Sequence, residues 1–175
     1  RILLDAGTCP GVEGRAGLPL YSQVAEQDVD AIAISHCHQD HCGSLPVALR
    51  HFPQARVLMT EPSYFLIERV LHNSVNVMKR QRAERNIPDY PLFHHNEVDE
   101  FSYLFQGFKY GKAEPWSPVR PGTADEPAPT VSFHPAGHVL GSAGLQVAHG
   151  RESLFYTGDV CFHDQTLSPK ADFSG

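Results

Sequence analysis

The chain contains 175 residues, of which 41% are hydrophobic and 19% are charged. This composition provides enough apolar surface for a folded core and excludes disordered and collagen-like proteins, and no apolar run approaches the roughly 18 residues that a membrane helix needs. The 14 basic and 20 acidic residues give a net charge of −6, which argues against a broad basic face for binding a polyanion.

Apolar runs bounded by turn residues predict a series of short strands. In chain order they cover residues 1–4, 30–35, 56–59, 105–110, 115–119, 129–133, 143–148 and 154–156. A Gly-rich loop follows the first strand to about Leu18, and the Pro-rich segment 121–129 is interpreted as an irregular excursion.

Helical patterns lie between the strands of the first half. Residues 40–50 are predicted as one helix, and a long helix runs from Glu61 to about Arg85, with Pro62 suited to its first turn. The apolar stripe of this long helix, predicted to face the core, consists of Phe65, Leu66, Val70, Leu71, Val75 and Met78. Asn96 is the expected N-cap of a short third helix. Strands in two groups with helices outside them favour a layered α/β fold.

The segment from His36 to His41 reads HxHxDH and directly follows the apolar run Ala31–Ile34. Alternate residues that leave a strand can point two side chains into one cleft. Imidazole nitrogens and a carboxylate suit zinc or a similar first-row divalent metal. The spacing therefore predicts a metal site at the end of this strand.

Two further candidate ligands follow about a hundred residues later. His138 lies in a Gly-rich loop between the predicted strands 129–133 and 143–148, and Asp159 directly follows the strand 154–156 and Gly158. Each of these signals alone is weak, because a Gly-His or Gly-Asp pair more often marks a turn. In sequence order with HxHxDH they become specific for a metal site.

Together with Asp5, which follows the first strand, these motifs resemble the first four motifs of the metallo-β-lactamase superfamily, in the same order. The amino-acid sequences of segments 41–46, 134–143 and 156–160 resemble those of the β-CASP branch, which contains RNA-processing nucleases. The resemblance implies an α/β fold, the αββα sandwich with a metal cleft at one edge. It also implies that residues 1–175 are part of one such domain, truncated at both ends, with the β-CASP cap domain expected after residue 175.

The resemblance assigns roles to seven residues. The implied metal ligands are His36, His38 and His138 for the first ion, Asp40 and His41 for the second, and Asp159 for both. Asp40 would also act as the general base, and Asp5 would orient a metal-ligand histidine, although a turn aspartate before Gly7 is an equal alternative. The expected cofactors are two zinc ions, with manganese as an alternative, and the second site lacks one histidine that the family pattern places after residue 175.

Other histidines and cysteines are interpreted as bystanders. Surface or capping roles are expected for the histidines without partners at ligand spacing, which are His51, His72, His94, His95, His149 and His163. His134 is a candidate for lining the cleft. Cys37 and Cys42 are interpreted as spacers, since strand alternation turns Cys37 away from the metal side. Four cysteines in this pattern do not indicate a disulfide framework, so we expect a reducing compartment, the cytoplasm.

One basic cluster, Lys79–Arg82 with Arg85, could contact phosphates, but a solvated helix end is the more common explanation of such a cluster.

Three functions remain. The first is a metal-dependent RNA nuclease that cleaves phosphodiester bonds of single-stranded RNA through a hydroxide activated by two metal ions. The second is a small-molecule hydrolase for a thioester, lactam or lactone, and the third is a non-catalytic scaffold, which the intact ligand set disfavours. The fragment alone is expected to be inactive.

Overall fold

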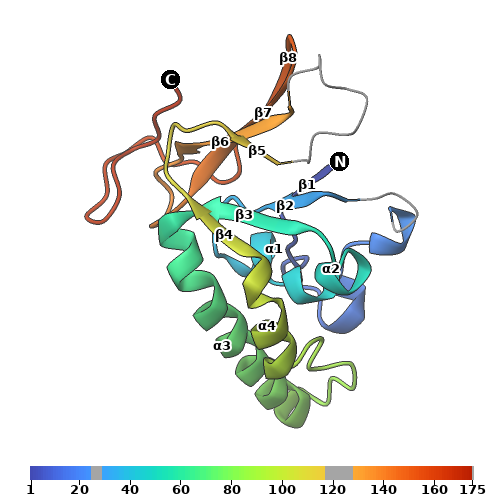
Figure 1. Cartoon of the computed structure of the whole chain (residues 1–175). Helices are drawn as coiled ribbons and strands as arrows, with labels where there is room; N and C mark the ends of the chain where they lie inside the picture. Colours follow the sequence, from blue (N-terminus) through green and yellow to red (C-terminus); the bar gives the residue numbers. More distant parts are fainter. Residues whose placement is uncertain (25–28, 117–127, 175) are drawn as a thin grey trace.

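Two four-stranded sheets lie against each other in the computed structural model, which describes residues 1–24, 29–116 and 128–174 (Figure 1). The first sheet is parallel and has the order β1 (Ile2–Leu4), β2 (Ala31–Ala33), β3 (Arg56–Thr60) and β4 (Phe105–Phe108). The second is antiparallel, with β5 (Glu114–Pro115), β6 (Thr130–Pro135), β7 (Ala143–His149) and β8 (Glu152–Tyr156). The described ranges contain no helix long and apolar enough to cross a membrane.

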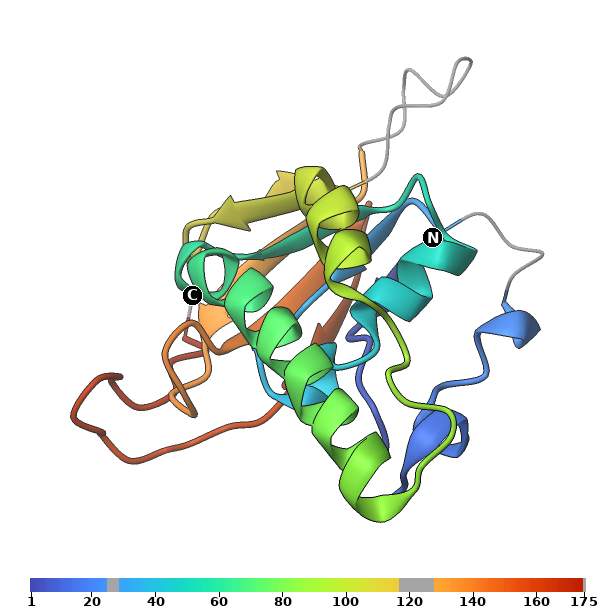
Figure 2. The same ribbon diagram turned by 90° about the horizontal axis from the view of Figure 1, so that it is seen from below.

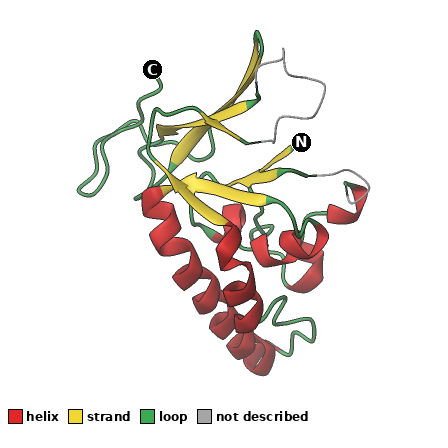
Figure 3. Ribbon diagram, viewed as in Figure 1, coloured by secondary structure: helices red, strands yellow, loops and turns green. Residues whose placement is uncertain are grey.

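The helices cover the outer face of the parallel sheet, as Figures 2 and 3 show. They are α1 (Gln39–Cys42), α2 (Leu45–His51), α3 (Glu61–Arg85) and α4 (His95–Phe101), with 3₁₀ turns at Gly14–Gly17, Tyr21–Gln23 and Ser102–Leu104. Three layers of the expected αββα sandwich are therefore visible in the described residues, namely one helical layer and two sheets.

Alternation along the central strands separates two apolar cores. Ile32 of β2 and Val57 and Met59 of β3 pack against the helices. Ala31 and Ala33 of β2 face the second sheet instead. Because successive side chains of a strand point to opposite faces, an all-apolar strand serves both cores at once. The small alanines leave room for large side chains of the second sheet, such as Phe133 of β6.

The predicted helix over residues 40–50 is wrong in one respect, because the chain forms two helices with a break at Gly43 and Ser44. The Ser44 N–H donates to the carbonyl of Ala6 at 2.9 Å instead of continuing the helical ladder. Its hydroxyl donates to the carbonyl of Gly7 at 2.7 Å and lies 3.0 Å from that of Ala6. The loop after β1 thus takes the donors that a continuous helix would use.

Two details of the other helices also differ from expectation. The N-cap of α4 is His94, not Asn96, and its backbone N–H donates to the Glu97 carboxylate at 2.9 Å. In α3, Phe65 is 71% exposed, whereas Ile67 is fully buried. The prediction for Phe65 is therefore wrong, and Ile67 takes its place in the core, whereas Leu71, Val75 and Met78 are buried as expected. Residues 117–119 of the predicted strand 115–119 and residues 121–127 of the Pro-rich segment lie outside the described residues.

Candidate metal centre

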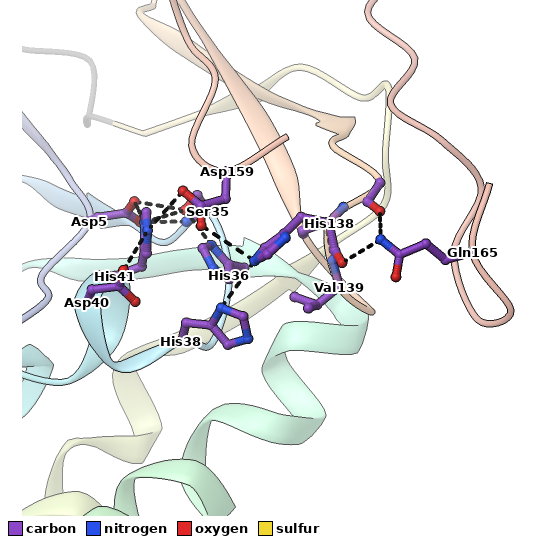
Figure 4. Close-up of polar contacts among 12 residues, drawn as sticks. Asp5, Ser35, His36, His38, Asp40, His41, His138, Val139, Asp159 and Gln165 are labelled. Atoms are coloured by element: carbon purple, nitrogen blue, oxygen red, sulfur yellow. Dashed lines mark hydrogen bonds and ion pairs between the residues drawn. The ribbon is translucent and has the colours of Figure 1, made fainter. Parts of the chain in front are cut away.

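The loops that leave three strands meet at one edge of the two sheets (Figure 4). His36 and His38 lie between β2 and α1, and His138 lies in the loop between β6 and β7. Asp159 follows β8, three residues after Tyr156. The hydrogen bond from Ala143 N to the carbonyl of Ser35, 2.9 Å long, ties the start of β7 to the loop after β2. The edge therefore combines residues from both sheets.

Four of the predicted ligands converge on one point. One ligand atom from each lies within 4.8 Å of those of the other three, and the four residues are His36, His38, His138 and Asp159. The Nε2 atom of His138 lies 3.2 Å from Nδ1 of His38 and 3.4 Å from Oδ2 of Asp159. Three imidazoles and one carboxylate suit a tetrahedral zinc or a similar divalent ion.

Of the remaining two predicted ligands, His41 lies beside the other oxygen of Asp159, and Asp40 lies beside His41. Nε2 of His41 is 3.4 Å from Oδ1 of Asp159 and 3.7 Å from Oδ2 of Asp40. The two oxygens of the Asp159 carboxylate therefore face different imidazoles, that of His138 and that of His41. This placement is what a carboxylate shared by two ions requires, and the shared role stays a prediction.

His36 provides a direct test of whether the pocket fits a metal ion. Its side chain is fully buried, and its Nε2 atom has no hydrogen-bond partner among the residues that the structure describes. Its Nδ1 atom lies 3.1 Å from the hydroxyl of Ser35. Burial lowers the pKa of His36 to about 4, and the charges of His41 and His38 contribute. A buried polar atom without a partner costs free energy, so a neutral imidazole with its free nitrogen in the cluster fits a metal ligand.

Asp5 holds His41, a predicted ligand of the second ion, on the side of the imidazole that faces away from Asp159. Its side-chain oxygens accept hydrogen bonds from Ser35 N at 2.7 Å, Ser35 Oγ at 2.8 Å and Tyr156 Oη at 2.9 Å. Its Oδ2 atom also lies 2.7 Å from Nδ1 of His41, and this hydrogen bond raises the pKa of His41, with burial opposing it. A proton on Nδ1 leaves Nε2 of His41 free toward Asp40 and Asp159. This geometry matches the orienting role predicted for Asp5, which remains untested.

Sequence reasoning missed Ser35 and Tyr156, which complete the Asp5 network. Ser35 is adjacent to the first histidine of the motif, and Tyr156 precedes Gly158 and Asp159, but neither residue type signals such a contact by itself. Burial and the charge of Asp5 raise the pKa of Tyr156, so its hydroxyl remains a donor. Ser35 and Tyr156 therefore hold the carboxylate of Asp5 in position, and this carboxylate orients His41.

The loop that carries His138 is held on both sides. The Ser142 hydroxyl accepts from the backbone N–H groups of His138 and Val139, at 3.0 and 3.1 Å. On the opposite side, the Gln165 side-chain amide donates to the carbonyls of Gly137 and His138, at 2.9 and 3.0 Å (Figure 4). Hydrogen bonds on both sides therefore fix the backbone from which the imidazole of His138 projects.

Three of the residues interpreted as bystanders or cleft-lining residues have contacts that do not involve the cluster. Cys37 contacts the carbonyl of Ser63 in α3, and Cys42 is fully buried in the helical core, as expected for spacers. His134 is buried beside Phe155 and lies 3.2 Å from the Ser132 hydroxyl, so it does not line the cluster as expected. His72, in contrast, has partners that sequence spacing did not show, because it belongs to a second group of candidate ligands.

The basic cluster is at the far end of α3, about 30 Å along the helix from its first residue. Within the cluster, Arg82 donates to the carbonyl of Tyr90 at 2.6 Å, and Arg85 pairs with Glu13. These contacts and the distance favour the interpretation as a helix end.

The sequence is similar to proteins named as ribonucleases and as a transcription termination factor. It is 31% identical over 159 residues to Endoribonuclease YSH1 of Gibberella zeae, which covers 90% of this chain and 18% of that protein. It is 28% identical to Transcription termination factor FttA of Methanocaldococcus jannaschii, over 95% of this chain and 24% of that protein. It is 31% identical to Ribonuclease TTHA0252 of Thermus thermophilus, over 98% of this chain and 36% of that protein. The chain thus spans about a fifth to a third of the length of these relatives.

One solved structure and a family model point to the same superfamily of folds. AidC, described as a dizinc quorum-quenching lactonase in complex with a product, superposes with a TM-score of 0.50 at 20% identity, over 89% of this chain and 51% of that chain. At this identity the likeness concerns the fold alone. The model of the metallo-beta-lactamase superfamily matches residues 1–171. The relatives also agree with the RNA-processing branch that the motifs resemble. The chain therefore belongs to the metallo-β-lactamase superfamily.

Proposed function

We propose that this chain provides the metal centre of a nuclease that cleaves phosphodiester bonds in single-stranded RNA. The observation that carries the proposal is the Asp159 carboxylate, whose two oxygens face the imidazoles of two ligand groups. The names of relatives that match 90% or more of the chain, an endoribonuclease and a ribonuclease, support RNA as the substrate. A β-CASP cap domain beyond residue 175 remains part of the proposal.

The proposed ligands divide into two groups around Asp159. Zinc is the expected ion at both, with manganese as the alternative; the first would be held by His36, His38 and His138, and the second by Asp40 and His41. Bound divalent ions supply Lewis acidity, which polarises a phosphoryl oxygen and makes water acidic enough to react at neutral pH.

The chain's own residues position and accept protons in this proposal. The side chain of Asp40 is 41% exposed and lies 3.7 Å from Nε2 of His41, so water reaches it and it can accept a proton from the attacking water. Asp5, at 8% exposure, keeps the proton of His41 on Nδ1 and thus away from the reacting side. We also propose the cytoplasm as the compartment, on the basis of four free cysteines among the described residues.

The test uses the complete protein and labelled single-stranded RNA in the presence of zinc or manganese. Cleavage is expected, with loss of activity after chelation and after His38→Ala. His149→Gln is the matched control, because it removes an exposed histidine at the end of β7. Hydrolysis of a lactone, lactam or thioester with RNA left intact under the same conditions would contradict the proposal and favour a small-molecule hydrolase.

A further inference from the structure

A second group of candidate ligands lies where α3 and α4 pack together, outside the centre described above. It consists of Glu68 and His72 of α3, one helical turn apart, and Asp99 of α4. Nε2 of His72 lies 3.1 Å from Oδ1 of Asp99 and 3.9 Å from Oε1 of Glu68. One ligand atom of each residue is within 4.8 Å of those of the other two.

A chain of polar contacts determines the proton position on His72. Nδ1 of His72 lies 2.8 Å from Nδ1 of His95, and Nε2 of His95 lies 3.2 Å from Oδ1 of Asn76. An amide oxygen only accepts, so the His95 proton is on Nε2, and its Nδ1 then accepts from His72. With one proton per ring, Nε2 of His72 carries a lone pair and faces the two carboxylates.

We propose that Glu68, His72 and Asp99 form a structural site for zinc or a similar divalent ion. A bare nitrogen that faces two carboxylates at these distances has no proton to share, and a cation removes the repulsion. Metal-bound histidines usually donate their other N–H to an acceptor that fixes the tautomer, which is the position of His95 here. Because the ligands come from two helices, the ion fastens α4 to α3.

The solvent exposure of the three ligands determines the zinc affinity that we expect for the site. The side chains of Glu68, His72 and Asp99 are 51%, 28% and 63% exposed, so water completes the coordination. Zinc is therefore expected to leave this site at lower chelator concentrations than it leaves the main centre. The alternative is an imidazolium: a doubly protonated His72 would donate to both Asp99 and His95 and would need no metal.

The experiment compares metal uptake by the complete protein and its variants. Chelator-treated protein is titrated with zinc chloride, and bound zinc is measured together with the thermal unfolding midpoint. We expect wild type to bind one zinc more per chain than His72→Gln, and zinc at the weaker site to raise the unfolding midpoint of wild type but not that of His72→Gln. His149→Gln, which removes an exposed histidine elsewhere, should behave like wild type.

Two further variants keep the test decisive if His72→Gln folds poorly. Asp99→Asn changes an exposed side chain by one atom and should also lose the additional zinc. His95→Phe keeps an aromatic ring but removes the acceptor, and should weaken zinc binding at this site by about tenfold or more. Equal zinc content and equal midpoint shifts in wild type, His72→Gln and Asp99→Asn would overturn the proposal and leave the ion pair as the explanation.

Discussion

Replacement of Asp5 by asparagine tests whether the hydrogen bond from Asp5 orients the imidazole of His41. The two side chains have nearly the same shape, and Asp5 has a φ of 61°, a conformation that asparagine also tolerates. In Asp5→Asn the side-chain oxygen can keep the bond from Ser35 N, but the amide nitrogen replaces the oxygen that faces His41. The hydroxyls of Ser35 and Tyr156 can rotate to become acceptors. The contact with His41 is different, because an amide nitrogen cannot accept the proton on its Nδ1 atom.

The expected magnitude follows from that single contact. A hydrogen bond to a charged group contributes about 1.5–3 kcal/mol. With an amide opposite Nδ1, the proton of His41 moves to Nε2, which faces Asp40 and Asp159, and a metal ion must displace it. We therefore expect zinc affinity to fall by about 10- to 100-fold in Asp5→Asn, which corresponds to roughly 1.4–2.7 kcal/mol.

The assay is competition for zinc against a chelator, with NMR of the His41 ring to locate its proton. Asp89→Asn is the matched control, because it removes an exposed carboxylate near Arg15, away from the cluster. Zinc affinity within about twofold of wild type, with the His41 proton still on Nδ1, would refute the role of Asp5.

Three other expectations concern the same centre. Asp40→Asn should lower RNA cleavage by the complete protein by about 100-fold or more with an unchanged unfolding midpoint, and near-normal turnover would remove Asp40 from the proton transfer. Gly141→Ala should lower the free energy of unfolding in urea by more than Gly150→Ala, because both have positive φ but only a Cβ at 141 would lie 2.7 Å from Ser63 Oγ; equal losses would exclude the clash. In the metal-free protein, the His36 ring should titrate near pH 4 by NMR. Between pH 6.5 and 4 the unfolded state then binds a proton that the native state does not, so the His36 contribution to stability falls with falling pH, by up to roughly 3 kcal/mol, and titration near 6.5 would contradict this.

Most of the fold could be predicted from local pattern. The apolar run that forms β2 and the Pro62 start of α3 are signals that a few neighbouring residues determine. The break between α1 and α2 could not be predicted this way, since it depends on Ser44 donating to the loop after β1, 37 and 38 residues away. The exposure of Phe65 could not be predicted either, because the apolar residues near the start of α3 do not show by themselves which of them contacts the sheet.

The candidate centre was predictable because its ligands come in motifs. HxHxDH and the residues around His138 and Asp159 are recognisable in order, and the structure brings these side chains together. The group around His72 was not, because Asp99 lies on another helix and no spacing rule connects the two. Contacts between elements are invisible to periodicity, which reports only one element at a time.

The hydrogen bond between Tyr156 and Asp5 joins residues 151 positions apart, and it has a consequence for biosynthesis. A growing chain emerges from the ribosome N-terminus first, so His36, His38 and Asp5 are exposed long before Tyr156 and Asp159 exist. Contacts between distant residues form late, after the entropy of closing the intervening chain has been lost. During that interval the histidines can bind metal only through an incomplete set of ligands, and the mature centre forms when the second sheet docks onto the first.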